Sequence, residues 1–431
     1  MEAKSIKDLK IGEVKVVGFV DRVRDQKSMQ FVLIKDRSGC LQITIEKEKQ
    51  PEIAQIFSKL QTGSVVLAEG RLIENPSVKQ DGRELLVDHV TVLSEAEVSK
   101  IDEKSSIDQR LDYRWLDLRD PKKRLIFEVQ TEFVYGMREY LEEKQFIEVH
   151  CPTISGNESE SGAGVFEVKY FNEKAYLIQS PQFYKQMAIA AGFEKVFIQT
   201  PIYRAENSHT KQHATEFSGF DLEFGPVFDV EDVMRVEEEL LLAGIKRVKE
   251  KLGEKVEKLL NVKIVVPSLP FPRITMKEAY KILDEELDYP LDEGEDFDRE
   301  AEKLLTSYMQ EKTGHQFFFV KEYPSGVRPF YSMKKEDDLD YSKTYDLYFK
   351  DVEITSGAVR EHRLDVLEKQ IKEKGLNPES MRSTYLDFFK YGCPPHGGFG
   401  MGLDRITMLL LDLPSLKEAM FIFRGPDRLR P

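Results

Sequence analysis

Residues 397–411, with the sequence GGFGMGLDRITMLLL, constrain this chain most strongly. A glycine-rich turn leads directly into an apolar run, and that run contains one arginine, Arg405. Because an apolar run predicts a buried element, a charge inside it needs an anionic partner. Arg405 is therefore a candidate for binding an anion. A glycine-rich turn before an ordinary core helix has the same pattern, so this segment alone leaves both interpretations open.

A second segment combines arginine with aromatic residues. Within residues 203–223, the stretches YRAE and ATEFSGFDLE flank a short polar loop. Apolar and charged residues alternate on both sides of this loop, which predicts an antiparallel hairpin. One face of the hairpin would carry Arg204, Glu206 and His213. A guanidinium suits a phosphate, and a flat aromatic ring such as Phe217 can stack on a purine.

Together the two segments predict a nucleotide site with two arginines, in a chain without a GxxxxGK[ST] loop. They resemble motifs 3 and 2 of the class II aminoacyl-tRNA synthetases. Further stretches are similar to the aspartyl-tRNA synthetases of the archaeal and eukaryotic type, and the resemblance extends over nearly the whole chain. These stretches are ESGAGVF at 160–166, QSPQFYK at 179–185, DLYFKDVEITSGAVR at 346–360 and YGCPPH at 391–396.

The resemblance implies ligation of L-aspartate to tRNA(Asp), with ATP and Mg²⁺ as cofactors. The α-carboxylate of aspartate attacks the α-phosphate of ATP, giving aspartyl-adenylate and pyrophosphate, and the terminal ribose of the tRNA then accepts the acyl group. A carboxylate is already ionised at neutral pH. The first step therefore needs no protein base, and catalysis is expected to come mainly from positioning and charge neutralisation.

The resemblance also assigns the ATP-binding residues. Arg204 is expected on the α-phosphate side and Arg405 at the γ-phosphate, and these two are the expected catalytic residues. Phe217 is expected to stack over the adenine, with Glu206 at the same end. The full expected set is Arg204, Ala205, Glu206, Gln212, His213, Phe217, Glu353, Gly402, Leu403, Asp404 and Arg405.

Two carboxylates are expected to hold the metal. Asp346 and Glu353 supply the hard oxygen ligands that Mg²⁺ prefers, bridging to the phosphates. His209 and His213 are four residues apart, but no third ligand has a fixed spacing from them. We therefore interpret His213 as a phosphate-binding residue and His209 as solvent-exposed.

Selection of aspartate over asparagine calls for positive charge. Lys185 and Arg360 match the family's side-chain carboxylate binders, and asparagine would leave these cations unpaired. Asp221 is expected to hold the α-ammonium group, and a small-residue loop with Glu160 and Ser161 resembles a lid. The full expected set is Glu160, Ser161, Gln182, Lys185, Arg204, Asp221, Ser356 and Arg360.

Residues 1–95 are expected to form a separate domain. Five short strand patterns and one helical pattern, separated by turn residues, suggest an OB-fold barrel, a known platform for single-stranded nucleic acid. The strands are expected at 14–23, 29–35, 40–46, 64–73 and 84–93, and the helix at 51–60.

In the family this barrel binds the anticodon. Phe31, for base stacking, with Gln42 and Glu84, for base edges, match its contact residues. Phe31 lies in the run FVLI, in which both strand faces are apolar, so the pattern alone favours a core aromatic. The net charge of the chain is −14, but residues 1–95 contain 15 basic and 15 acidic residues. Charge therefore neither supports nor excludes binding of tRNA.

Residues 96–115 are expected to be a linker and residues 116–431 the class II catalytic domain, an α+β unit with a mostly antiparallel sheet flanked by helices. A helical pattern at 116–145 and a strand at 146–153 resemble motif 1, which forms the dimer in class II enzymes. We therefore expect a homodimer, although an ordinary core helix has the same pattern. A second amphipathic helix is expected at 229–260.

The remaining composition suggests a cytoplasmic enzyme. No apolar run approaches the ~20 residues of a membrane span, the N-terminus is unlike a signal peptide, and three scattered cysteines imply neither disulfide nor zinc.

Three residues depart from the family pattern, namely Gln212, Val359 and Gly425. These departures bear on the catalytic rate and the fine specificity of the enzyme. Charging of tRNA(Asn) as a second substrate stays open. The sequence also leaves open an asparaginyl-tRNA synthetase, a tRNA-independent amino-acid-activating paralogue and a non-catalytic tRNA-binding module.

Overall fold

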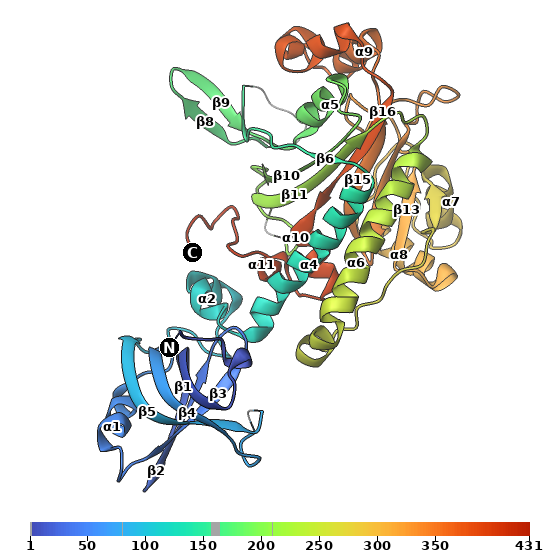
Figure 1. Cartoon of the computed structure of the whole chain (residues 1–431). Helices are drawn as coiled ribbons and strands as arrows, with labels where there is room; N and C mark the ends of the chain where they lie inside the picture. Colours follow the sequence, from blue (N-terminus) through green and yellow to red (C-terminus); the bar gives the residue numbers. More distant parts are fainter. Residues whose placement is uncertain (1, 80, 157–163, 209) are drawn as a thin grey trace. The chain divides into compact units, whose positions relative to one another are not determined.

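The structure is a computed structural model that describes residues 2–79, 81–156, 164–208 and 210–431. The chain divides into two compact units, Met1–Pro121 and Lys122–Pro431 (Figure 1). Residues 96–115, the expected linker, belong to the first unit and include α2 (Ile107–Asp112), which a capping box at Ser106 begins. The domain boundaries expected from the sequence stay a prediction.

The first unit contains a closed five-stranded barrel, so the expectation of an OB-fold is confirmed. Its strand order is β1-β2-β3-β5-β4, and β1 pairs with β4 to close the barrel. Alternate residues such as Val32 and Ile34 point into the apolar core. The elements are η1 (Ile6–Asp8), β1 (Gly12–Asp25), β2 (Met29–Lys35), β3 (Cys40–Glu46), α1 (Pro51–Lys59), β4 (Val65–Glu74), β5 (Arg83–Ser94) and α3 (Arg114–Asp117).

The second unit is built on an eight-stranded sheet with the order β12-β13-β14-β15-β16-β11-β10-β6. Only the outer pairs β12–β13 and β10–β6 are parallel, so the sheet is mostly antiparallel, as expected. Its strands are β6 (Ile147–Glu148), β10 (Lys195–Tyr203), β11 (Glu216–Phe224), β12 (Arg273–Thr275), β13 (Phe317–Lys321), β14 (Thr344–Phe349), β15 (Val352–Arg360) and β16 (His396–Gly402).

Two long helices, α4 (Pro121–Glu143) and α6 (Val230–Leu260), run beside each other along the sheet (Figure 1). Gly136 of α4 meets Gly244 of α6, and a Cβ atom on Gly136 would lie 2.9 Å from the Cα of Gly244. The helices approach closely because both contact residues lack side chains. An ion pair at 2.7 Å between Arg247 and Glu132 links them further.

The helix expected at 116–145 begins later than the pattern indicated. Pro121 occupies its first position, where a missing N–H costs nothing, and residues 114–117 form the separate turn α3. The strand expected at 146–153 is also shorter, since β6 pairs with β10 at only two positions. The helix expected at 229–260 is α6, which Asp229 caps by accepting a hydrogen bond from the backbone N–H of Glu231.

The remaining elements surround this sheet. A small sheet with the order β7-β9-β8 precedes α5 in the chain, and α7 and α8 pack on β13 and β14. Among the described residues, we find no helix with the length and apolarity that a membrane span requires. The elements are β7 (Ile154–Ser155), β8 (Glu167–Tyr170), β9 (Glu173–Leu177), α5 (Gln182–Ala190), α7 (Met276–Glu285), α8 (Arg299–Thr313), α9 (Leu364–Glu373), η2 (Pro378–Met381), η3 (Arg382–Leu386), η4 (Asp387–Tyr391), α10 (Leu403–Leu410) and α11 (Leu416–Ala419).

Candidate functional site

A cavity of about 320 Å³ in the second unit collects most of the residues expected at the ATP and aspartate sites. Side chains from α5, β11, β15, β16 and α10 reach it, together with the loop between β10 and β11. The expected residues that line it are Gln182, Lys185, Arg204, Glu206, Gln212, His213, Phe217, Asp221, Glu353, Ser356, Arg360, Gly402, Asp404 and Arg405.

Some expected residues do not line this cavity. Ala205 lies beside it, where its N–H donates to the carbonyl of Gly164. Leu403 is buried at the start of α10, and Asp346 lies behind Ser356. The expected lid residues Glu160 and Ser161, and also His209, lie outside the described residues.

The hairpin expected from the motif 2 segment is confirmed. Strands β10 and β11 pair antiparallel up to Tyr203 and Glu216. Arg204, Glu206 and His213 lie in the connecting loop, however, and not on a strand face as we expected. Because the strands end at Tyr203, these side chains reach the cavity from irregular backbone.

The C-terminal segment holds this loop in place. The N–H of Leu416 donates to the carbonyl of Lys211 at 2.9 Å, and the N–H of Thr215 donates to the carbonyl of Arg424 at 3.0 Å. Leu416 also lines the cavity. The loop that carries Gln212 and His213 is therefore fixed by residues that are distant in the sequence.

Arg204 and Arg405 reach the cavity without a carboxylate partner in the described part of the chain. The guanidinium of Arg204 lies 5.6 Å from the ring centroid of Phe217, and its buried Nε has no hydrogen-bond partner among these residues. Arg405 is on the first turn of α10 and donates to the backbone carbonyl of Glu353 at 2.8 Å. Two guanidinium groups without counterions favour an anionic ligand.

The environment of His213 agrees with this interpretation. Burial, and then the nearby Arg405 and Arg204, lower the pKa of His213 below its ordinary value, against the opposing effect of Glu206. The imidazole is therefore neutral at physiological pH. It can donate one hydrogen bond to an anion without adding a third positive charge.

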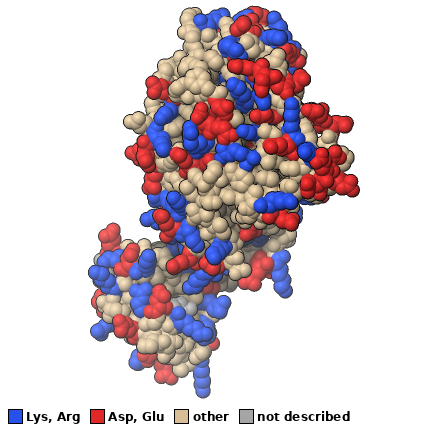
Figure 2. Space-filling model, turned by 90° about the vertical axis from the view of Figure 1, so that its right-hand side faces the viewer, with Lys and Arg blue, Asp and Glu red and all other residues tan. Residues whose placement is uncertain are grey.

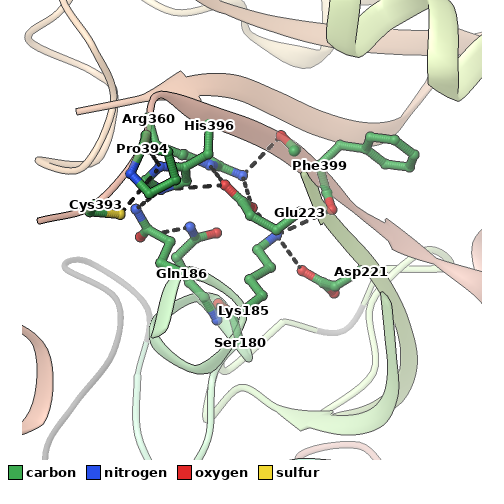
Figure 3. Close-up of polar contacts among 12 residues, drawn as sticks. Ser180, Lys185, Gln186, Asp221, Glu223, Arg360, Cys393, Pro394, His396 and Phe399 are labelled. Atoms are coloured by element: carbon green, nitrogen blue, oxygen red, sulfur yellow. Dashed lines mark hydrogen bonds and ion pairs between the residues drawn. The ribbon is translucent and has the colours of Figure 1, made fainter. Parts of the chain in front are cut away.

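The cations expected to select aspartate are buried and already paired. Lys185 on α5 lies 2.9 Å from Asp221 and 3.4 Å from Glu223, and it donates to the carbonyl of Phe399 (Figure 3). Arg360, at the end of β15, donates from Nε to Glu223 at 3.0 Å and from Nη2 to the carbonyl of Gly398 at 2.9 Å.

This pairing corrects one step of the sequence argument. We expected asparagine to leave Lys185 and Arg360 unpaired, but Asp221 and Glu223 already balance both charges. Burial alone would raise the pKa of Glu223, yet Arg360 and Lys185 hold it below its ordinary value, so Glu223 stays ionised. Aspartate must therefore share the two cations with carboxylates of the protein.

The glycines of β16 make this arrangement possible. A Cβ atom on Gly400 would lie 2.9 Å from Oδ2 of Asp221, and one on Gly398 would collide with the backbone of β11 and with Glu223. Side chains at these two positions would displace the carboxylates. The glycine-rich pattern in the sequence therefore reflects close packing against Asp221 and Glu223.

A second layer of buried polar groups supports this pocket (Figure 3). His396 donates from Nδ1 to the carbonyl of Pro394 at 2.8 Å, because a carbonyl can only accept, and its Nε2 then accepts from Gln186 at 2.9 Å. Gln186 also accepts from Tyr385 and Gln182. These bonds fix His396 in one tautomer, and burial lowers its pKa, so the imidazole is neutral.

Oxygen atoms of Glu353 and Ser356, which line the cavity, lie close to the carboxylate of Asp346. The hydroxyl oxygen of Ser356 lies 2.6 Å from Oδ1 of Asp346 and 3.2 Å from Oε1 of Glu353, and its single proton is donated mainly to the nearer Asp346. Burial and the neighbouring Asp346 raise the pKa of Glu353 to about 7, although Arg405 and Arg328 oppose this shift. Two carboxylates and a hydroxyl fit Mg²⁺, which takes its other ligands from water and phosphates. No cluster of three or more His, Cys, Asp or Glu suited to a metal occurs within the described ranges.

A separate cavity of about 670 Å³ on the barrel contains the residues expected to bind the anticodon. Phe31, Gln42 and Glu84 all line it. Phe31 is half-buried and lies outside the barrel core, with the guanidinium of Arg24 5.2 Å from its ring centroid. The core position that the apolar pattern favoured is therefore wrong, because Val32 and Ile34 on the opposite face fill the interior.

Two charged residues at or beside the main cavity were missed from the sequence. Glu223 follows Asp221 at the spacing that places both carboxylates on one face of β11, so the strand pattern contained the signal. Arg328 pairs with Asp346 from an irregular segment, and no local pattern points to it.

Comparisons with known proteins agree with this arrangement. The family model for class II tRNA synthetases (D, K and N) matches residues 106–423, and a model for the OB-fold nucleic acid binding domain matches residues 14–93. Aspartate–tRNA(Asp) ligase of Pyrococcus abyssi is 42% identical, and aspartate–tRNA(Asp/Asn) ligase of Aeropyrum pernix is 41% identical. Each alignment covers 97% of this chain and 96% of the relative.

A solved structure shows the same fold over the full length. Asparaginyl-tRNA synthetase from Pyrococcus horikoshii, complexed with asparaginyl-adenylate, superposes with a TM-score of 0.91 at 32% identity, covering 100% of both chains.

Proposed function

The chain belongs to the class II tRNA synthetases (D, K and N), and we propose that the cavity of its second unit forms aspartyl-adenylate for transfer to tRNA. The enzyme is an aspartate–tRNA ligase, as its full-length relatives at about 40% identity support. The ATP-binding, aspartate-binding and tRNA-binding roles given below to individual residues are part of the proposal.

One observation carries the proposal for the site. Within the described residues, the cavity contains three cations with carboxylate partners, Lys185, Arg360 and Arg328, and two without, Arg204 and Arg405. The unpaired arginines suit a polyphosphate, whereas the paired cations suit a ligand that carries both a carboxylate and an ammonium group. ATP and aspartate together supply these groups.

The residue roles follow from this division. Arg204 neutralises charge at the α-phosphate, where the α-carboxylate of aspartate attacks, and Phe217 stacks on the adenine. Arg405 neutralises the departing pyrophosphate, and neutral His213 donates a hydrogen bond to it. Each group acts by fixing reactants and charge before the reaction, so no proton is transferred to the protein in adenylate formation.

Aspartate would bind against Lys185 and Arg360 with its side-chain carboxylate, and against Asp221 with its ammonium group. Gln182, held by Gln186, and Ser356 also line this cavity. The lid role of Glu160 and Ser161 also stays part of the proposal.

Mg²⁺ would be held by Asp346 and Glu353, and when bound it would offset the negative charge of the phosphates. Ser356 keeps the two carboxylates together through its hydroxyl. The oxygen donors alone support this assignment.

We also propose that the barrel binds the anticodon of tRNA(Asp) through Phe31, Gln42 and Glu84. The side chains of Gln42 and Asn75 both donate to Glu84, and the ring of Phe31 lines the same cavity, where it can stack on a base. A second copy of the chain is proposed to dock on α4, as in class II enzymes.

Charging of tRNA(Asn) with aspartate is the second candidate. The relative from Aeropyrum pernix carries the name aspartate–tRNA(Asp/Asn) ligase, and the one from Pyrococcus abyssi the name aspartate–tRNA(Asp) ligase, at nearly equal identity. Aminoacylation of both tRNA transcripts with aspartate distinguishes the two activities.

Pyrophosphate exchange into ATP, measured with each amino acid and without tRNA, tests the proposed function. Aspartate should support exchange, and asparagine should be poorer by about 10³ or more, because a site built for a charged group rejects its neutral analogue strongly. Exchange with asparagine that equals or exceeds exchange with aspartate would overturn the assignment.

A further inference from the structure

Arg328 is the one residue that lines the main cavity and also forms a forked ion pair with an expected metal ligand, among the residues that the structure describes. It lies in the irregular segment between β13 and β14. Its Nη1 donates to Oδ1 of Asp346 at 3.0 Å and its Nη2 donates to Oδ2 at 2.5 Å. The guanidinium carbon lies 3.6 Å from the ring centroid of Tyr323, which holds it from the other side.

This pair is buried. The side chains of Arg328 and Asp346 are 11% and 4% exposed. Two parallel hydrogen bonds between a guanidinium and a carboxylate fix both orientation and charge, and water screens a buried pair only weakly. Asp346 is therefore neutralised before any other cation arrives.

Most hydrogen-bond acceptor positions of the Asp346 carboxylate are already occupied. Ser356 donates to Oδ1 at 2.6 Å, so Oδ1 accepts two hydrogen bonds and Oδ2 accepts one. A carboxylate offers about four lone-pair positions. One position therefore remains, on Oδ2.

We infer that Arg328 is a positioning residue that limits Asp346 to one free acceptor position and offsets its charge, so that the free protein binds a divalent cation weakly. The phosphates of ATP then supply most of the ligands and the negative charge. This inference rests on the proposed function, because it concerns the same Mg²⁺ site. It adds a residue outside the expected metal ligands that sets the affinity for the ion.

The direction in which replacing Arg328 changes the affinity for a divalent cation separates this role from a merely structural one. Groups hydrogen-bonded to a metal ligand tune the affinity for the metal, and mutating them typically changes metal binding by about 10- to 100-fold. Arg328 is a cation that donates to the ligand. Its loss should therefore strengthen the binding of a dication, on a similar scale.

The test uses Mn²⁺ as the probe and the full-length protein without nucleotide. Free Mn²⁺ is measured by electron paramagnetic resonance during a titration at fixed pH and salt concentration. Arg328→Met removes the charge but keeps an unbranched side chain. Arg328→Gln removes the charge but keeps one donor, and it serves if the methionine variant does not fold. Arg328→Lys keeps the charge and is the matched control.

We expect both neutral variants to bind Mn²⁺ about 10-fold or more tightly than the wild type. The lysine variant should stay within about 3-fold of the wild type, since its charge is retained. Adding Asp346→Asn to the methionine variant should abolish the gain. Thermal unfolding of each variant shows whether it is folded.

Equal or weaker Mn²⁺ binding by a folded neutral variant would overturn the inference, as would an equal gain in the lysine variant. Failure of the proposed function is seen separately, because the wild type would then give no aspartate-dependent pyrophosphate exchange. If the wild type supports aspartate-dependent pyrophosphate exchange but the neutral variants do not bind Mn²⁺ more tightly, only the role of Arg328 is excluded.

Discussion

The guanidinium of Arg360 donates to the carboxylate of Glu223 at 3.0 Å, and both side chains are buried. Arg360 therefore has two functions that experiments can separate. It balances a carboxylate of the protein, and it is proposed to bind the carboxylate of the substrate. Removing one partner of a buried ion pair leaves an uncompensated charge, which costs about 3–5 kcal/mol.

We predict that Arg360→Ala raises the KM for aspartate and lowers the thermal unfolding midpoint. Adding Glu223→Gln should restore much of the midpoint, because the unpaired charge is gone, but it should not restore the KM. Pyrophosphate exchange and thermal unfolding of the single and double variants measure the two effects. A double variant that recovers the KM would show that Arg360 acts only through Glu223.

Arg405→Ala should lower adenylate formation by about 10²- to 10³-fold, the scale for loss of one preorganised group that stabilises charge. The protein should remain folded, since Arg405 is bonded only to the backbone carbonyl of Glu353 among the described residues. Single-turnover formation of aspartyl-adenylate measures the rate. Arg235→Ala, which removes an exposed arginine of α6, is the control. Figure 2 shows many exposed Lys and Arg side chains on the face that it draws. Full activity of Arg405→Ala would mean that motif 3 was misinterpreted.

Local sequence patterns determined much of the fold. Alternating residues and turn residues gave the five barrel strands within a few positions, because one face of each strand must fill the closed barrel. The helix at α4 was predicted five residues too early, since residues 114–117 have a helical pattern but form a separate turn. Helix ends depend on capping and on neighbouring segments as much as on periodicity.

The pairing of charges in the site was less accessible from the sequence. The segment that contains Arg328 has no regular periodicity, so nothing local shows that it reaches Asp346 on β14. Glu223 was visible as a strand residue, but its partner Arg360 lies on another strand, β15. The sequence therefore identified the cations of the pocket but not their counterions. In the structure, each of these cations is already paired with a carboxylate of the protein.

Glu237 should make the stability of the enzyme depend on pH. It lies fully buried on α6, where Tyr345 donates to it at 2.5 Å and Thr355 also donates. Burial raises the pKa of Glu237 to about 8 from an ordinary value of 4.5. The folded state therefore binds more protons than the unfolded state between these values, so stability falls as the pH rises from about 4.5 to 8, by at most about 1.4 kcal/mol per pH unit.

We predict that Glu237→Gln, which stays neutral, matches the wild type in thermal midpoint near pH 5 and exceeds it near pH 8.5. Unfolding followed by circular dichroism across this range measures the difference. Glu250→Gln changes an exposed residue of the same helix and should leave the pH profile unchanged. A constant difference between Glu237→Gln and the wild type at all pH values would show that Glu237 is ionised in the folded protein.

Phe31→Leu should impair charging of tRNA and leave adenylate formation intact. Leucine keeps the apolar character of this half-buried position but cannot stack on a base, and stacking contributes about 1–3 kcal/mol per base. We therefore expect a roughly 5- to 150-fold loss in kcat/KM for tRNA(Asp), with unchanged pyrophosphate exchange. Phe31→Tyr keeps the ring and should retain most of the activity. Since a barrel that does not read the anticodon would tolerate either substitution, equal aminoacylation by both variants would show that Phe31 does not stack on an anticodon base.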